Sequence, residues 1–187
     1  AYERTSGSVL LGGRELKINN PSQAVKNGIA LVPEERRKEG VLVNENVTLN
    51  LSAAALSKFC NGSFVSKAKT EKNAHEYVEG LDIKTPSIKQ HVKNLSGGNQ
   101  QKIILAREME NHPELLVAVH PTRGLDIGAS QYVHDTMIEA RDKGCGILLI
   151  SADFDEQLDL SEKLYGNTLI SRYLPPNTVS MSRLSIL

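Results

Sequence analysis

Two short apolar runs on either side of a helical stretch constrain the fold of this chain more than any other feature. Leu115–Val119 and Cys145–Ser151 contain no charged residue, and Ala129–Lys143 between them carries apolar residues at helical spacing. Strands that are apolar on both faces are typical of a parallel sheet covered by helices. The sequence therefore predicts an α/β fold with a mostly parallel sheet.

The N-terminal part of the chain predicts three further elements. Ser8–Leu11 and Glu15–Ile18 flank Gly12-Gly13, which is a hairpin signal. Pro21–Lys26 follows as a short helix with proline at its start. Ile29–Val32 is a buried-strand candidate. These elements would add one strand to the sheet and a small hairpin beside it.

Beyond this strand, the pattern becomes mostly helical. Thr48–Phe59 reads as one helix, Asn61–Ser63 interrupts the chain, and Lys67–Leu81 reads as a second helix. We interpret residues 36–95 as a helical insertion between two pieces of the sheet. A short helix is also expected over Asp155–Lys163.

The charge balance weighs against nucleic acid as a partner. The chain has 187 residues, with 22 Lys and Arg against 22 Asp and Glu, so no net positive field attracts phosphates. There is no tryptophan, and base-stacking aromatic residues are few. Cys60 and Cys145 lie far apart without metal-ligand spacing, as expected for a reduced cytosolic protein.

Leu95–Lys102, which reads LSGGNQQK, opens a helix predicted over Ser96–Glu110. Ser96 is a good N-cap, and the two glycines after it let another molecule approach the backbone closely. The N–H groups of a first helical turn have no partner within the helix. Together with the helix dipole, they form a site suited to phosphate.

Leu95–Lys102 also resembles the signature of ATP-binding cassette (ABC) ATPases, in the form typical of simple-sugar and nucleoside importers. Pro121–Asp126 is similar to the stretch that follows the Walker B strand in these proteins and ends in the D-loop. Val32–Gly40 is similar to the Q-loop region of their second cassette. The three landmarks occur in the family's order, and the resemblance covers roughly residues 7 to 165.

The resemblance implies a P-loop NTPase-like ABC cassette that is N-terminally incomplete. Residues 1–35 would hold the N-terminal strands and the Q-loop, 36–95 the helical insertion, and 96–170 the signature helix and α/β core. Residues 171–187 match no family element and form an unplaced tail. We expect the sheet to be incomplete, with one edge exposed or covered by this tail.

The resemblance also implies a shared ATP site. Two cassettes face each other in this family, and the signature of one contacts the nucleotide and Mg²⁺ held by the other. The implied contacts are Ser96, Gly97 and Gly98 with the γ-phosphate, Asn99 and Gln100 along the same edge, Asp126 at the dimer seam, and Glu34 where many cassettes have the Q-loop glutamine.

Four catalytic parts of the family pattern are absent or replaced. No G-x-x-x-x-G-K-[ST] phosphate loop occurs, and Gly7–Gly12 has only its glycine spacing. Val119 and His120 occupy the Walker B acidic positions, and Ala152 occupies the switch-histidine position. We therefore assign no catalytic residue and no metal ligand, and expect weak or absent nucleotide binding and no hydrolysis by this chain alone.

An acidic run in the C-terminal part of the chain could suggest a cation site. It consists of Asp153, Asp155, Glu156 and Asp159, at the start of the helix expected there. Acidic residues are favourable near a helix N-terminus because of the helix dipole. We interpret the run as a solvated first turn.

The leading hypothesis is a cytoplasmic ATP-binding domain of a simple-sugar or nucleoside importer, peripheral on the inner face of the cell membrane. Its partners would be a second cassette, in the same polypeptide or another, and a transmembrane permease. Two alternatives stay open. One is a soluble ABC-type ATPase of DNA repair or translation, and the other is a non-catalytic pseudo-cassette that binds a partner.

Overall fold

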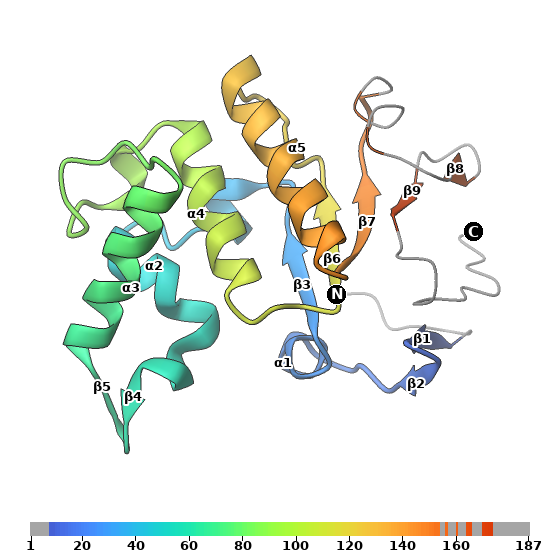
Figure 1. Cartoon of the computed structure of the whole chain (residues 1–187), viewed down its shortest axis with the longest axis horizontal. Helices are drawn as coiled ribbons and strands as arrows, with labels where there is room; N and C mark the ends of the chain where they lie inside the picture. The colour runs from blue at the N-terminus through green and yellow to red at the C-terminus, as the bar shows by residue number, and fades with distance from the viewer. Residues whose placement is uncertain (1–7, 154–155, 157–159, 161–163, 166–169, 174–187) are drawn as a thin grey trace.

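The computed structural model of the chain describes residues 8–153, 156, 160, 164–165 and 170–173 (Figure 1). Within this part, the central sheet has five strands in the order β3-β6-β7-β9-β8. They are β3 (Ile29–Val32), β6 (Leu115–Val119), β7 (Gly146–Ile150), β9 (Ile170–Tyr173) and β8 (Leu164–Tyr165). The first three run parallel, and β9 pairs antiparallel with both β7 and β8. The predicted α/β class with a mostly parallel sheet is confirmed.

Two long helices pack on each other and on this sheet. α4 (Gly97–Met109) contacts β3, and α5 (Ile127–Asp142) contacts β7 (Figure 1). Ile103 and Ile104 of α4 and Leu116 of β6 are fully buried in the main core. Both helices begin close to where the sequence places them, because Ser96 and Asp126 cap them.

The N-terminal elements agree with their predicted positions. β1 (Val9–Leu11) and β2 (Arg14–Leu16) form an antiparallel hairpin. Gly12 and Gly13 turn the chain with φ of 56° and 75°, values that glycine adopts without strain. α1 (Pro21–Lys26) follows. Val9–Leu11 is therefore a strand, and the glycine spacing around it does not form a phosphate loop.

The insertion is mostly helical, but the predicted helix over Thr48–Phe59 is wrong. The chain forms α2 (Val47–Ser52) and then a 3₁₀ segment, η2 (Ala53–Phe59), with a kink at Ala55. The Ser52 hydroxyl donates to the Thr48 carbonyl at 2.9 Å, and a serine bonded back in this way often bends a helix.

The rest of the insertion holds a small hairpin and a regular helix. β4 (Cys60–Asn61) pairs with β5 (Phe64–Val65) around the predicted interruption. α3 (Lys67–Gly80) matches the second predicted helix, and packs on α2. Two short helical turns, η1 (Arg36–Gly40) and η3 (Val92–Asn94), join the insertion to β3 and α4.

Part of the tail has a place in the sheet, contrary to its assignment as unplaced from residue 171. β9 includes residues 171–173 and pairs with β7, with Ile170 opposite Ile150 and Tyr173 opposite Ile147. These residues extend the sheet beyond β7, and β8 rather than β9 forms the edge on this side. Residues 174–187, and most of the helix expected over Asp155–Lys163, lie outside the described residues.

Candidate functional site

The N-terminal turn of α4 has the geometry expected of an anion site. The Ser96 hydroxyl oxygen accepts from the Asn99 backbone N–H at 3.4 Å and from Asn99 Nδ2 at 2.9 Å. The N–H groups of Gly97 and Gly98 precede any possible i−4 partner in the helix. The dipole of this 13-residue helix adds partial positive charge at the same point.

Gly98 is required by packing within the chain. A Cβ atom at this position would lie 2.8 Å from the Cβ of Ala129, on the first turn of α5. At Gly97, a Cβ would lie 3.4 Å from Arg36 Nη2 and 3.7 Å from Leu125 Cδ2. The two glycines therefore bring α4, α5 and the loop before α5 into close contact, in addition to exposing the backbone of the turn.

The side chain of Gln100 is buried rather than displayed along the edge. It is 2% exposed, and its Nε2 donates to the carbonyls of Val92 at 3.2 Å and Leu95 at 3.0 Å. The amide thus holds the segment that leads into α4. Asn99 stays near the surface, where its Oδ1 accepts from the Lys84 backbone N–H at 2.9 Å.

A cavity of about 450 Å³ lies beside the first turn of α4. We call it the arginine cavity. Its lining includes Arg36, Arg37, Arg123, Glu34 and Gly97. Burial, and after it the neighbouring Arg37 charge, lower the pKa of the Arg36 guanidinium. The cavity beside the turn with unpaired N–H groups is thus lined by three arginines and two glutamates, Glu34 and Glu35.

Two contacts join the loop after β3 to the loop after β6 at this cavity. Glu34 forms an ion pair with Arg123. Arg36 Nη1 donates to the carbonyl of Arg123 at 2.5 Å. The structure therefore places Glu34 at the same cavity as Gly97 of the signature turn and pairs its carboxylate within the chain.

Asp126 has a local role as the N-cap of α5. Its Oδ1 accepts from the Ala129 backbone N–H at 2.8 Å. The next residue, Ile127, is 90% exposed, which is unusual for a large apolar side chain. The start of α5 therefore presents an apolar side chain beside the predicted seam.

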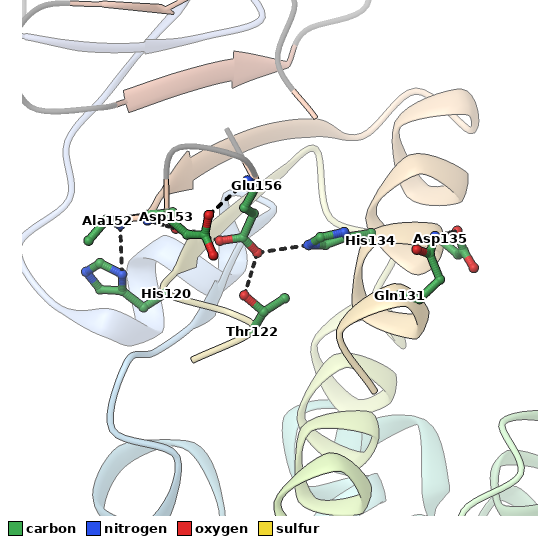
Figure 2. A network of polar contacts seen from close by, with 9 residues as sticks. His120, Thr122, Gln131, His134, Asp135, Ala152, Asp153 and Glu156 are labelled. Atoms are coloured by element: carbon green, nitrogen blue, oxygen red, sulfur yellow. Dashed lines mark hydrogen bonds and ion pairs between the residues drawn. The ribbon is translucent and has the colours of Figure 1, made fainter. Parts of the chain in front are cut away.

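His120 and Ala152 lie next to each other at the ends of β6 and β7. His120 adopts a positive φ of 44°, and its backbone N–H donates to the Ile150 carbonyl at 2.7 Å. Its Nδ1 accepts from the Ala152 backbone N–H at 3.2 Å (Figure 2). The local hydrogen bond favours a structural role for His120, and Val119 before it offers no oxygen ligand.

A second cavity, of about 680 Å³, opens at these strand ends. We call it the strand-end cavity. His120, Thr122, Ser130, Ser151 and Asp153 are among its lining residues. Among the described residues, no group of three or more His, Cys, Asp or Glu side chains could hold a metal ion. Val119 and His120, at the substituted positions, carry no carboxylate that could bind a magnesium ion.

The interpretation of the acidic run as a solvated turn is wrong for Glu156. Its side chain is buried, and its carboxylate accepts from Thr122 Oγ1, Ser151 Oγ and His134 Nε2. Burial raises the pKa of this carboxyl, but the three hydrogen bonds outweigh it and hold the pKa below its usual value. Asp153 is exposed, as expected, and Asp155 and Asp159 lie outside the described residues.

The sequence contained one signal for the Glu156 cluster. Asp153 and Glu156 have the spacing of a capping box, and the Glu156 backbone N–H donates to Asp153 Oδ1 at 3.2 Å. The glutamate of such a box ordinarily reaches back to the capping residue. Here it turns inward to Ser151 and Thr122 instead, which no local pattern predicts.

Comparison with known proteins identifies the chain. The sequence model described as ABC transporter matches residues 1–123, about two thirds of its length. The chain belongs to the ABC transporter family. Proteins of this family bind ATP with Mg²⁺ and work as pairs of cassettes with a transmembrane permease.

Curated relatives of this ABC chain are named as sugar-import proteins. It is 38% identical over 164 residues to the ribose import ATP-binding protein RbsA of Clostridium tetani, covering 87% of this chain and 32% of the relative. It is 36% identical over 161 residues to the xylose import ATP-binding protein XylG of Thermoanaerobacter pseudethanolicus, covering 86% and 32%. The chain thus spans about a third of the length of these relatives.

Solved structures confirm the cassette fold. A nucleotide-free ATP-binding cassette from an ABC transporter superposes with a TM-score of 0.67 at 19% identity, covering 85% of this chain and 64% of that one. A dimeric cassette bound to ADP and Pi gives a TM-score of 0.65 at 18% identity, covering 81% and 65%. In the described part of this ABC chain, no helix is both long and apolar enough to cross a membrane.

Proposed function

We propose that this chain is part of the ATP-binding subunit of an importer for a simple sugar or a nucleoside, and that it supplies its signature turn to the ATP site of a partner cassette. The observation that carries the proposal is the Ser96-capped turn of α4, with its free N–H groups beside the arginine cavity. The sugar-import names of the relatives favour this substrate class.

In this proposal, the chain's own site does not hydrolyse ATP. Hydrolysis needs a carboxylate for the Mg²⁺ shell and a group that orients water. Val119 and His120 stand at those positions, and the imidazole is already bonded to Ala152. ATP and Mg²⁺ would therefore be held by the partner, with Ser96, Gly97 and Gly98 contacting the γ-phosphate and Asp126 at the seam.

The partner cassette could lie in the same polypeptide, because the relatives are about three times as long as the matched region. The insertion, together with the Glu34 loop, would dock on the transmembrane permease. The subunit would then sit at the cytoplasmic face of the cell membrane.

A charge placed in the signature turn tests the proposal. In the full-length importer in vesicles, Ser96→Arg puts a long cation where the partner's nucleotide must approach. We expect sugar uptake and ATP turnover to fall at least 100-fold, while ATP binding by the partner persists. The matched control is Ser22→Arg on exposed α1, which should keep both activities. Normal uptake by the Ser96→Arg importer would refute the shared-site proposal.

Titration calorimetry of the chain with MgATP tests the inactive own site. The chain alone should bind MgATP weakly and release no phosphate. Micromolar binding with turnover would refute this part of the proposal. If binding of the intact partner is unaffected by Ser96→Arg and by MgATP, the chain is a pseudo-cassette instead. Co-purification with ribosomes or DNA, in place of membranes, would favour the soluble ATPases.

A further inference from the structure

A buried carboxylate ties together three segments that are distant in the sequence. Glu156 Oε1 accepts from Thr122 Oγ1 at 2.7 Å and from His134 Nε2 at 3.0 Å (Figure 2). Its Oε2 accepts from Ser151 Oγ at 2.5 Å. Thr122 lies on the loop after β6, His134 lies on α5, and Ser151 directly follows β7. Hydrogen bonds to an ionised acceptor are stronger than those between neutral groups, so Glu156 is a firm anchor.

Thr122 differs from the other two donors in its position. It belongs to the loop of residues 121–126, which we call the junction loop. This loop continues to Gly124 and Leu125, which lie against the first turn of α4. A Cβ at Gly97 would be 3.7 Å from Leu125 Cδ2 and 3.9 Å from the Gly124 carbonyl oxygen. The junction loop thus connects the Glu156 anchor to the signature turn.

Other contacts also hold the junction loop. Two are backbone hydrogen bonds that close turns. The Arg123 N–H donates to the His120 carbonyl, and the Leu125 N–H donates to the Thr122 carbonyl. At the surface, Arg123 pairs with Glu34 and its carbonyl accepts from Arg36, and the partly buried Leu125 packs against the main core. Among the side-chain hydrogen bonds of this loop that the structure describes, the one from Thr122 has a buried partner. The Thr122–Glu156 bond therefore joins this loop to a buried part of the protein.

We propose that Glu156 is a positioning residue that, through Thr122, fixes the junction loop against the signature turn. The loop then holds Gly97 and Ser96 in the orientation in which they meet the nucleotide of the partner. The effect on the partner's site rests on the proposed function, whereas the effect on the loop does not.

Valine in place of Thr122 tests the proposal with little change of shape. Thr122→Val removes the hydroxyl, and Thr122→Ser keeps it. His134→Leu is the matched control, because it deletes a bond to the same Glu156 oxygen from outside the loop. Amide hydrogen exchange of the full chain should be about tenfold faster in Thr122→Val at Asn99, Arg123 and Leu125, whose N–H groups are hydrogen-bonded, the effect of one lost hydrogen bond. The serine variant and His134→Leu should exchange there like the wild type.

Equal exchange at these amides in Thr122→Val and His134→Leu would overturn the proposal, because the network would then only add stability. If Thr122→Val does not fold, Thr122→Ala provides the same comparison without the branched side chain. The thermal midpoints of all variants show whether the folded states compared are equally stable.

ATP turnover in the complex with an intact partner cassette tests the part of the proposal that concerns the partner's site. Thr122→Val should lower kcat several-fold with an unchanged KM for ATP, and Thr122→Ser should restore it. Faster exchange with normal kcat would overturn the functional part. A wild-type chain that does not stimulate the partner would refute the proposed function, while the exchange result would still decide the role of Glu156 in the loop.

Discussion

His120 Nδ1 accepts a hydrogen bond from the backbone N–H of Ala152 across a distance of 3.2 Å. The two residues stand where the family resemblance places the hydrolytic glutamate and the switch histidine. They lie at the ends of the neighbouring parallel strands β6 and β7. The side chain at one substituted position therefore bonds to the backbone at the other, and this hydrogen bond joins the two strand ends.

This bond predicts the tautomer of His120. Because Nδ1 is an acceptor, the neutral imidazole must carry its proton on Nε2. A long-range ¹H–¹⁵N correlation spectrum of the chain at pH 8 should show the Nε2-protonated pattern for this ring. The assignment is checked with His120→Asn, which removes the signal and suits a positive φ. A ring protonated on Nδ1 would contradict the observed geometry.

The contact between Gly98 and Ala129 predicts that Gly98→Ala lowers the free energy of unfolding. The added methyl group would meet Ala129 Cβ at 2.8 Å, and such overpacking costs about 1 to 3 kcal/mol. Urea denaturation measures the change. Ala129→Gly removes the facing methyl group, so the double variant should recover part of the loss. Strictly additive effects in the double-mutant cycle would show that the two residues do not meet.

The Glu156 cluster predicts a stability that depends on pH in the acid range. The hydrogen bonds hold the pKa of this buried carboxyl below its ordinary value of 4.5. A lowered folded-state pKa adds stability above the unfolded pKa, and this stability is lost as the pH falls through the folded pKa. Thermal melts should therefore show a contribution that is full above about pH 5 and declines below pH 4.5. Glu156→Gln should lack this component, and an unchanged acid profile in that variant would contradict the assignment.

The two cysteines should differ in reactivity. Cys145 is buried at the start of β7, and burial raises the pKa of its thiol to about 11. Cys60 lies partly exposed at the hairpin of the insertion. An aromatic disulfide reagent at pH 8 should therefore label one thiol rapidly in the native chain and both in urea. Cys60→Ser should abolish the fast phase, and a fast phase that persists would place Cys145 at the surface.

The elements that follow simple periodic or capping rules were predictable from sequence. β6 and β7 are continuous apolar runs, and α4 and α5 start at the N-caps Ser96 and Asp126. The break between α2 and η2 was not predictable, because the apolar pattern continues through it. The Ser52 hydroxyl bonded to the Thr48 carbonyl favours a bend here, and helical spacing carries no record of that bond.

Within the site, sequence reasoning identified the positions better than their local contacts. The Ser96 cap follows from its residue type, whereas the place of Glu34 beside Gly97 at the arginine cavity was not predicted. The burial of Gln100 and Glu156 was missed. Each is a polar residue in a polar run, and its partners come from segments that only the fold brings near.

The pairing of β3 with β6 has a consequence for how the chain can vary. Ile29 lies opposite Leu115, so this contact closes a loop of 86 residues that contains the whole insertion. The entropy lost on closing such a loop rises only with the logarithm of its length, and doubling it costs about 0.6 kcal/mol. Insertions and deletions between the two strands therefore change the entropy cost of loop closure very little. This region can therefore change in length while the sheet and the signature turn keep their geometry.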